Sequence, residues 1–84
     1  MDLRAQFAQA QQDVHGLSRR PDDATLLQLS ALFKQATAGD AGDDRPGGFD
    51  FVRRAKYDAW NALRGTSAED AMQRYVDLAA RLNV

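Results

Sequence analysis

The stretch LFKQATAGD, residues 32–40, ends one expected helix and leads into the longest connection in the chain. Its Phe33 and Lys34 place an aromatic ring beside a cation. A second segment that combines cations with aromatic rings, RRAKYDAWN, follows at residues 53–61. The chain has two lysines, Lys34 and Lys56, and each segment holds one of them. We therefore interpret the rest of the chain as a scaffold that brings these two segments together.

Length and composition restrict the class of protein. Eighty-four residues, of which 44% are hydrophobic, make one domain with a small core. The absence of cysteine excludes disulfides and thiolate–metal sites. A net charge of −1 argues against a nucleic-acid-binding protein. Because no apolar run approaches ~18 residues and the N-terminus lacks an apolar signal core, we expect a cytoplasmic chain.

The first half of the chain predicts two helices. Apolar residues recur at steps of three and four over residues 3–17, which is the spacing of an amphipathic helix. Pro21 prevents its continuation, and Asp22 is a suitable N-cap for the next helix. A broad apolar face follows from Leu26 to residue 36, and Gly39 supplies a helix stop.

The second half of the chain predicts two more helices. Asp50 can cap a third helix that ends at Gly65, and Thr66 and Ser67 compete to cap a fourth. Strand signals are absent, so the prediction is an all-α protein.

The connection over residues 40–50 decides how the helices are arranged. Twelve extended residues reach ~40 Å, whereas a helix of about 16 residues is ~24 Å long. The connection can therefore return to the starting end of the second helix, and the second and third helices need not be antiparallel neighbours. This predicts a four-helix bundle with a long crossover connection between helices two and three.

Few residues could carry chemistry. His15 is the single histidine and has no cysteine to join it, which excludes a histidine- or cysteine-based metal site. The chain has no phosphate-binding glycine loop and no serine in the context of an activated nucleophile, so an enzyme is disfavoured. Lys34 and Lys56 remain: an ammonium suits a phosphate, and an aromatic face suits a stacked base. The competing interpretation is that both lysines are solvated surface residues and the rings belong to the core.

Four segments in order resemble the acyl-CoA-binding protein family. They are Lys34-Gln35-Ala36-Thr37 with Ala38-Gly39-Asp40, Arg45-Pro46-Gly47 with Asp50-Phe51, Ala55-Lys56-Tyr57-Asp58-Ala59-Trp60-Asn61, and Gly65-Thr66-Ser67 with Glu69-Asp70-Ala71-Met72. The similarity covers essentially all 84 residues as a single acyl-CoA-binding domain.

The resemblance implies a bundle of up-down-down-up type and a non-enzymatic, monomeric carrier of long-chain acyl-CoA thioesters such as palmitoyl-CoA, with no cofactor. It also implies transient contact with membranes or with acyl-CoA-using enzymes. In the family, lysines matching Lys34 and Lys56 contact the ribose 3′-phosphate. An aromatic matching Phe33 stacks near the adenine, and a tyrosine matching Tyr75 joins the site. Positions matching Leu26 and Leu27 line the acyl path.

Two residues depart from the family pattern. Ser30 stands where members usually carry a tyrosine whose hydroxyl reaches the phosphate, and Phe33 stands where they usually carry another. A charge-assisted hydrogen bond contributes roughly 1.5–3 kcal/mol, so the Ser30 difference alone can weaken binding about tenfold. His15, where members often carry a lysine, or Arg53 and Arg54 can compensate. The alternative function is a helical interaction module or regulatory domain that kept the fold and lost the ligand.

The remaining aromatic residues are assigned structural roles. Trp60 is expected to anchor the core with its indole N–H satisfied. Phe49 and Phe51 are expected to hold the long connection onto the bundle. If acyl-CoA binds, the amines of Lys34 and Lys56 should face the same cleft.

Overall fold

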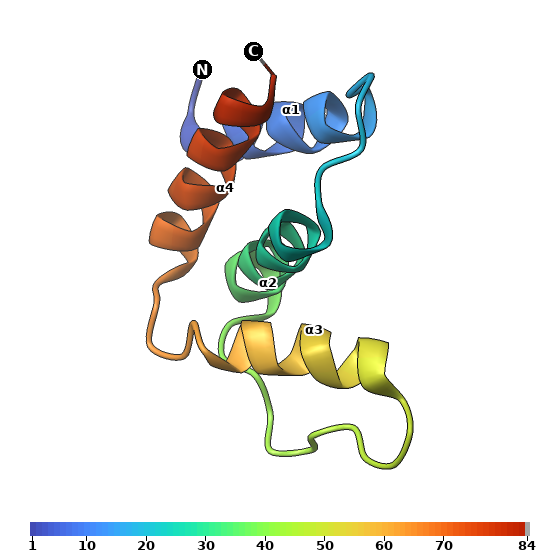
Figure 1. The fold of residues 1–84 in the computed structure, drawn as a ribbon. Helices are drawn as coiled ribbons and strands as arrows, with labels where there is room; N and C mark the ends of the chain where they lie inside the picture. The colour runs from blue at the N-terminus through green and yellow to red at the C-terminus, as the bar shows by residue number, and fades with distance from the viewer. Residues whose placement is uncertain (84) are drawn as a thin grey trace.

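The structure, a computed structural model, describes residues 1–83 and is built from four helices. These are α1 (Leu3–His15), α2 (Asp23–Ala38), α3 (Phe51–Asn61) and α4 (Ala68–Leu82), arranged as Figure 1 shows. No strand occurs within residues 1–83, so the all-α prediction is confirmed. Over the same residues, no helix is both long and apolar enough to cross a membrane.

A side chain caps the start of every helix. In each case a side-chain oxygen accepts a hydrogen bond from the backbone N–H three residues further on, at 2.8–3.3 Å. The caps are Asp2, Asp22, Asp50 and Ser67. These bonds satisfy N–H groups that have no partner inside the helix. The predicted caps Asp22 and Asp50 are confirmed, and Ser67 rather than Thr66 starts α4.

Two helices end earlier than predicted. α1 ends at His15 instead of residue 17, because the Gly16 N–H already bonds three residues back as well as four. α3 ends at Asn61, and the N–H groups of Leu63 and Arg64 bond three residues back, in a tightened turn. The chain then passes through Gly65, whose φ of 89° is a conformation that glycine adopts without strain.

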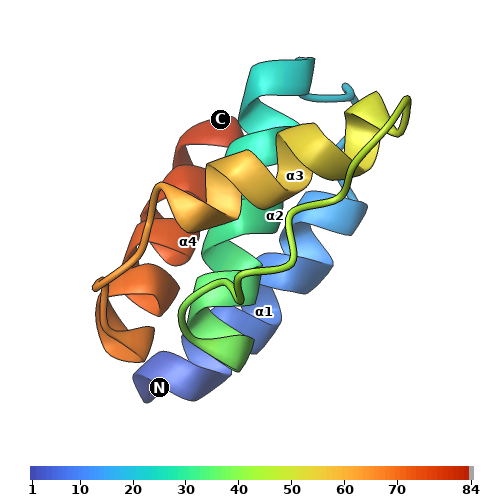
Figure 2. The same cartoon turned by 90° about the horizontal axis from the view of Figure 1, so that it is seen from below.

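The helices pack in three pairs. Over the described residues, the helix pairs whose backbones approach closely are α1–α4, α2–α4 and α2–α3. α2 and α3 run parallel, since their first halves line one cleft and their last turns meet where the Trp60 indole N–H donates to the Gly39 carbonyl at 2.8 Å. Figure 2 shows α3 crossing over α2. The up-down-down-up prediction is therefore confirmed.

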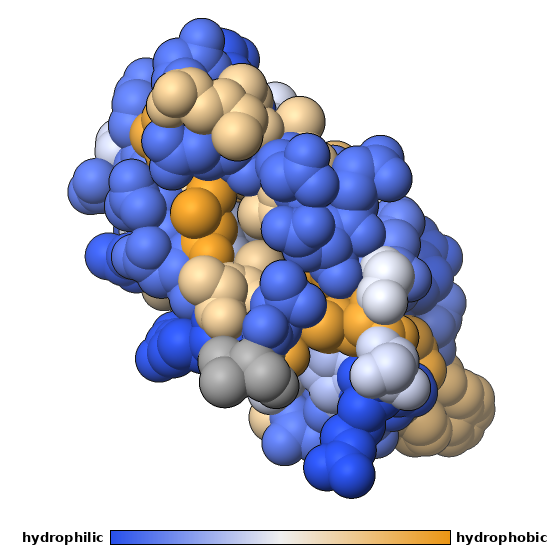
Figure 3. Space-filling view, turned by 90° about the horizontal axis from the view of Figure 1, so that it is seen from above, coloured by the Kyte–Doolittle hydropathy of each residue, from blue (hydrophilic) through white to orange (hydrophobic). Residues whose placement is uncertain are grey.

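The core lies between α1, α2 and α4. Phe7 of α1 meets Tyr75 of α4 edge-to-face, with ring centroids 5.1 Å apart. Other core side chains are Leu29 and Leu32 of α2 and Ala71, Met72, Leu78 and Ala79 of α4. From above, in Figure 3, hydrophilic residues cover most of the surface, and apolar residues appear between them and at its outer edges. α3 contributes no buried residue to this core.

A buried glutamine joins the end of α2 to the link between α3 and α4. Gln35 is 1% exposed, and its Nε2 donates to Asp40 Oδ1 at 2.8 Å and to the Thr66 carbonyl at 2.9 Å. The Gly65 backbone N–H donates to the same Asp40 oxygen at 2.9 Å. These bonds, that from Gly65 first and that from Gln35 second, hold the pKa of Asp40 below its usual value. Asp40 therefore fixes the point where the long connection begins.

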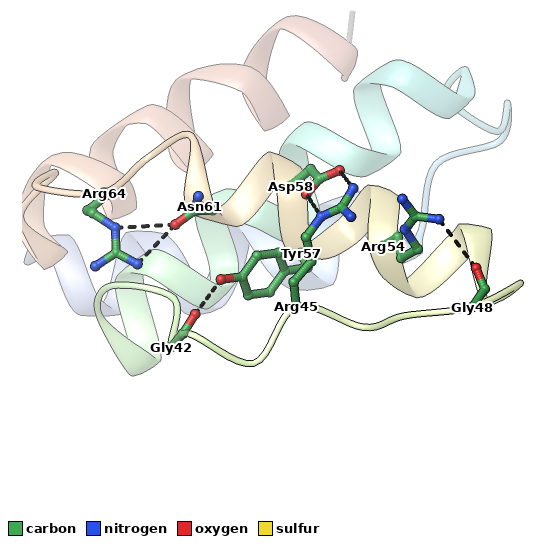
Figure 4. A network of polar contacts seen from close by, with 8 residues as sticks. All are labelled: Gly42, Arg45, Gly48, Arg54, Tyr57, Asp58, Asn61 and Arg64. Atoms are coloured by element: carbon green, nitrogen blue, oxygen red, sulfur yellow. Dashed lines mark hydrogen bonds and ion pairs between the residues drawn. The ribbon is translucent and has the colours of Figure 1, made fainter.

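The crossover, residues 39–50, returns along α3 in the opposite direction to that helix, as Figures 1 and 2 show. Side chains of α3 and of the turn after it bind crossover backbone at several points, of which Figure 4 shows those of Tyr57 and Arg54. These contacts are Trp60 to Gly39, Arg64 to Ala41, Tyr57 to Gly42 and Arg54 to Gly48. Arg45 adds a paired contact to Asp58 at 2.8 and 2.9 Å. Polar contacts thus hold the crossover, in agreement with the predicted return to the start of α2.

The prediction for Phe49 and Phe51 is wrong. Phe49 is 90% exposed and Phe51 is 66% exposed, so neither ring holds the connection onto the bundle. Their place is taken by the arginine, tyrosine and tryptophan contacts described above. The indole N–H of Trp60 is satisfied, as predicted, but the residue is half-buried and lies outside the core cluster, so it does not anchor the core.

Candidate ligand-binding cleft

A cleft of about 650 Å³ opens between the first halves of α2 and α3. α2 contributes Asp23, Leu26, Leu27 and Ser30, α3 contributes Phe51, Val52, Ala55 and Lys56, and Arg20 precedes α2. The volume falls within the range of about 300–1,000 Å³ that is typical of small-molecule sites. The parallel packing of α2 and α3 creates this space, because it leaves the first turns of both helices side by side.

The cleft combines apolar walls with positive charge. Leucine, phenylalanine, valine and alanine side chains make up most of the lining, and Lys56 stands exposed among them. Arg20 also lines the cleft and pairs with Asp23 at 3.1 Å, where both side chains are largely exposed. Such exposed pairs are weak. The lining therefore suits a molecule that has both an apolar part and an anionic group.

Four of the eight residues predicted for the site lie in this cleft: Leu26, Leu27, Ser30 and Lys56. They come from two helices and are joined here by the tertiary fold. Leu26, Leu27 and Ser30 are half-buried, and Lys56 is exposed. Their roles toward a ligand stay a prediction.

Lys34 lies beside the cleft and not among its lining residues. Its Nζ lies 5.6 Å from the centre of the Trp60 ring, which is a cation–π contact between α2 and α3. Trp60 follows Lys56 by one helical turn, and Lys34 follows Ser30 by one turn. The two lysines therefore lie one helical turn apart along the α2–α3 junction. We expected both amines to face the same cleft, but of the two only Lys56 lines it, whereas the Lys34 amine lies over Trp60.

Phe33 and Tyr75 belong to an aromatic cluster centred on Phe7. The Phe33 ring stacks on Phe7 with centroids 6.0 Å apart and is 37% exposed. Tyr75 packs on the same ring and is 5% exposed. This burial raises the pKa of the Tyr75 hydroxyl. His15, the last residue of α1, is exposed. The structure thus divides the predicted site between the cleft, the lysine–tryptophan contact, the aromatic cluster and the end of α1.

Sequence reasoning missed five residues that line the cleft: Arg20, Asp23, Phe51, Val52 and Ala55. A signal was available for three of them. Phe51, Val52 and Ala55 lie at steps of three and four from one another or from Lys56, so they share a helix face with it. Arg20 precedes Pro21 in a link, where periodicity says nothing about direction.

The cleft holds few groups of the kinds that act in catalysis. Within residues 1–83, no cluster of three histidine or acidic side chains could hold a metal ion. The cleft lining offers one carboxylate, that of Asp23, and it is paired with Arg20.

Comparison with known proteins identifies the family. Residues 4–79 match the family model described as acyl CoA binding protein. The chain belongs to the acyl-CoA-binding protein family. It is 49% identical over 77 residues to an acyl-CoA-binding protein homolog of Manduca sexta, a match that covers 90% of this chain and 86% of that protein. The family resemblance noted in the sequence is therefore confirmed.

Solved structures support the acyl-CoA-binding fold. The chain superposes on Oryza sativa acyl-CoA-binding protein 2 with a TM-score of 0.90 and 35% identity, covering 95% of this chain and 87% of that one. For the acyl-CoA-binding protein of Moniliophthora perniciosa the TM-score is 0.83 and the identity 40%, over 93% and 76% of the two chains.

A similar domain also occurs within an enzyme. The chain is 47% identical over 77 residues to enoyl-CoA delta isomerase 2 of Rattus norvegicus, which covers 92% of this chain but 20% of the rat protein. Members of the acyl-CoA-binding protein family are binding proteins, and the match leaves four fifths of the isomerase without a counterpart here.

Proposed function

We propose that this protein is a non-enzymatic, monomeric, cytoplasmic carrier of long-chain acyl-CoA thioesters. Lys34 and Lys56 bind the nucleotide 3′-phosphate, and the acyl chain lies against the apolar walls of the cleft. The observation that carries this proposal is the cleft between α2 and α3, in which Leu26 and Leu27 lie opposite Val52 and beside the exposed Lys56. An acyl-CoA has the matching combination of a polyanionic head and an apolar tail.

The head group is recognised by cations on two helices. Helices hold charged groups in place better than loops do, and Lys56 and Lys34 occupy neighbouring turns of the α2–α3 junction. The Lys34 amine rests on Trp60 in the free protein. Its flexible four-carbon stem allows it to leave the ring and reach a phosphate bound near Lys56.

The tail supplies most of the affinity. Each methylene sheltered from water contributes ~0.8 kcal/mol, so a long chain binds orders of magnitude more tightly than a short one. Phe33 stacks the adenine, with Tyr75 behind it across the shared Phe7 ring. His15 is assigned a contact to the phosphates of the head group.

Calorimetry with three ligands tests the proposal. Palmitoyl-CoA should bind tightly, whereas free CoA and palmitate should each bind weakly, because each has half of the matching chemistry. No heat with palmitoyl-CoA contradicts the proposal and favours the helical interaction module, for which Ser30 and Phe33 are the reason in the sequence.

Single lysine variants test the head-group assignment. Lys34→Ala and Lys56→Ala should each weaken palmitoyl-CoA binding by about tenfold or more, because each removes a charge-assisted contact. Both side chains are exposed, so the free energy of unfolding should change by less than about 1 kcal/mol, with the Lys34 variant also losing its contact with Trp60. Arg74→Ala is the matched control, since it removes one exposed cation from α4. If both lysine variants bind like this control, the head-group site lies elsewhere.

A further inference from the structure

An ion pair lies at one end of the cleft, where α2 begins. Arg20 and Asp23 both line the cleft, and Arg20 Nη2 lies 3.1 Å from Asp23 Oδ1. Arg20 Nη1 also donates to the Pro21 carbonyl at 3.3 Å, which holds the guanidinium on the link before α2. The two side chains are 70% and 87% exposed, so both charged groups remain accessible to a ligand in the cleft.

The other end of the cleft holds Ser30 and Lys56. Ser30 lies two helical turns, or about 10 Å, after Asp23 along α2. Lys56 is level with Ser30, because each lies one turn before a partner in the contact between Lys34 and Trp60. Between the two ends the walls are apolar, formed by leucines of α2 and by phenylalanine, valine and alanine of α3. An acyl chain that runs along these walls from a head group held at Lys56 therefore meets the ion pair.

A plain hydrocarbon chain makes no use of this ion pair. Its last carbons displace water from Arg20 and Asp23 without replacing the hydrogen bonds that the water makes. The guanidinium presents N–H donors and the carboxylate presents acceptor oxygens, side by side, and a hydroxyl group is a donor and an acceptor at once. A carboxylate on the chain would instead be attracted by Arg20 and repelled by Asp23. The pair is therefore complementary to a neutral hydroxyl.

We propose that Arg20 and Asp23 together select acyl-CoA thioesters whose acyl chain carries a hydroxyl at its far (ω) end. The hydroxyl donates to the Asp23 carboxylate and accepts from an N–H of Arg20. Because the pair is exposed, water competes for both partners, and the gain over the unsubstituted chain is about threefold to tenfold in Kd. This selectivity rests on the proposed carrier function, since it acts on the acyl chain of the same ligand.

Calorimetry with two matched pairs of ligands tests the selectivity. The pairs are palmitoyl-CoA with ω-hydroxypalmitoyl-CoA, and lauroyl-CoA with ω-hydroxylauroyl-CoA. Without a partner in the protein, a terminal hydroxyl leaves affinity unchanged or lowers it, because a polar group is taken from water. The hydroxylated ligand should instead bind about threefold to tenfold more tightly than its parent at the chain length that reaches the ion pair. If it binds no more tightly at either length, the proposal is wrong.

Substitutions of the ion pair assign the preference to these two residues. The readout is the ratio of the two Kd values within one matched pair, so a general loss of affinity or stability in a variant cancels. Arg20→Met and Asp23→Ala should each bring this ratio close to one, because each removes one partner of the hydroxyl. Arg19→Met is the matched control, since Arg19 is exposed next to Arg20 but does not line the cleft, and it should keep the ratio of the parent. A preference that survives in Arg20→Met overturns the proposal.

A ligand with an ω-carboxylate tests whether the two residues act together. The parent protein should bind ω-hydroxypalmitoyl-CoA more tightly than the ω-carboxyl analogue of the same length, because Asp23 repels the carboxylate. Asp23→Ala should reverse this order, since it removes the repulsion and leaves the Arg20 cation. Tighter binding of the carboxylate by the parent would mean that Arg20 acts alone, which contradicts a joint site for a hydroxyl.

Failure of this proposal is distinguishable from failure of the carrier function. Tight binding of palmitoyl-CoA without a preference for the hydroxylated chain overturns the selectivity alone. Absence of heat with all four acyl-CoA ligands contradicts the carrier function, and the selectivity with it. A preference that Arg20→Met and Asp23→Ala abolish and Arg19→Met keeps supports both.

Discussion

α3 and α4 are both amphipathic, yet the fold uses their apolar faces in different ways. α4 buries five residues against α1 and α2: Ala71, Met72, Tyr75, Leu78 and Ala79. α3 buries none, and its apolar residues Phe51, Val52 and Ala55 line an open cleft. Polar contacts to the crossover hold α3 in place, in addition to its packing on α2. An amphipathic pattern therefore identifies a helix face that apolar atoms cover. It does not say whether those atoms belong to the protein or to a ligand.

The largest expected effect is a comparison of two leucines of α2. Leu29 is 4% exposed in the core, and Leu27 is half-buried on the cleft. Leu29→Ala should lower the free energy of unfolding by roughly 2–5 kcal/mol, as expected for a cavity in a packed core. Leu27→Ala should cost less stability and weaken palmitoyl-CoA binding. Urea denaturation measures the free energy of unfolding, and calorimetry measures palmitoyl-CoA binding. Equal losses of stability in the two variants would contradict the distinction between a core face and a cleft face of α2.

Next in size is a gain of affinity in the cleft. Ser30→Tyr restores the hydroxyl that the family usually places here and should tighten palmitoyl-CoA binding by about tenfold. Ser30→Phe is the matched control, because it adds the ring without the hydroxyl. Calorimetry with both variants attributes the gain: if Phe and Tyr tighten binding equally, buried area is responsible and the hydroxyl makes no contact.

A smaller effect on stability is expected from removing the ion pair that joins the crossover to α3. The side chains of Arg45 and Asp58 are 47% and 51% exposed, so solvent screens their pair. Arg45→Ala should lower the free energy of unfolding by about 1 kcal/mol or less. Amide hydrogen exchange should nevertheless speed up in the crossover and α3 while α4 is unaffected. A uniform increase over all four helices would mean that α3 is not a separate unit.

The smallest expected effect concerns how the stability of the fold changes at acid pH, through Asp40. The pKa of Asp40 lies below its usual value of 3.8 because the Gly65 N–H and the Gln35 amide donate to the carboxylate. A lowered pKa means that the ionised form stabilises the fold. This contribution is fully present above about pH 3.8 and is lost as the pH falls through the pKa of the folded protein. Asp40→Asn should therefore show a shallower loss of stability below pH 3.8 than the parent, as measured by thermal melts across that range.

Features that depend on neighbouring residues, such as helix caps, could be predicted from the sequence. The caps Asp22 and Asp50 follow from residues a few positions away, because a cap acts within one helical turn. The length of residues 40–50 left a parallel course of α2 and α3 open, and the family resemblance implied that course.

Features that depend on tertiary contacts, such as the exposure of a ring or the direction of an amine, could not be predicted from the sequence. The exposure of Phe49 and Phe51 follows from the path of the crossover, which Tyr57, Arg64 and Asp58 fix from the opposite side of the turn. The position of the Lys34 amine over Trp60 depends on how closely α2 and α3 approach. Nothing in the local sequence specifies that approach.

The pairing of α1 with α4 has a consequence for folding during synthesis. Over the described residues, the backbone of α1 packs closely against α4 and not against α2, its neighbour along the chain, which α1 reaches through the stacking of Phe7 on Phe33. As the chain leaves the ribosome, α1 emerges first but must wait for α4 before it can bury most of its apolar face. The nascent domain therefore exposes that face through most of its translation, and the native packing forms in a late step that joins two distant segments.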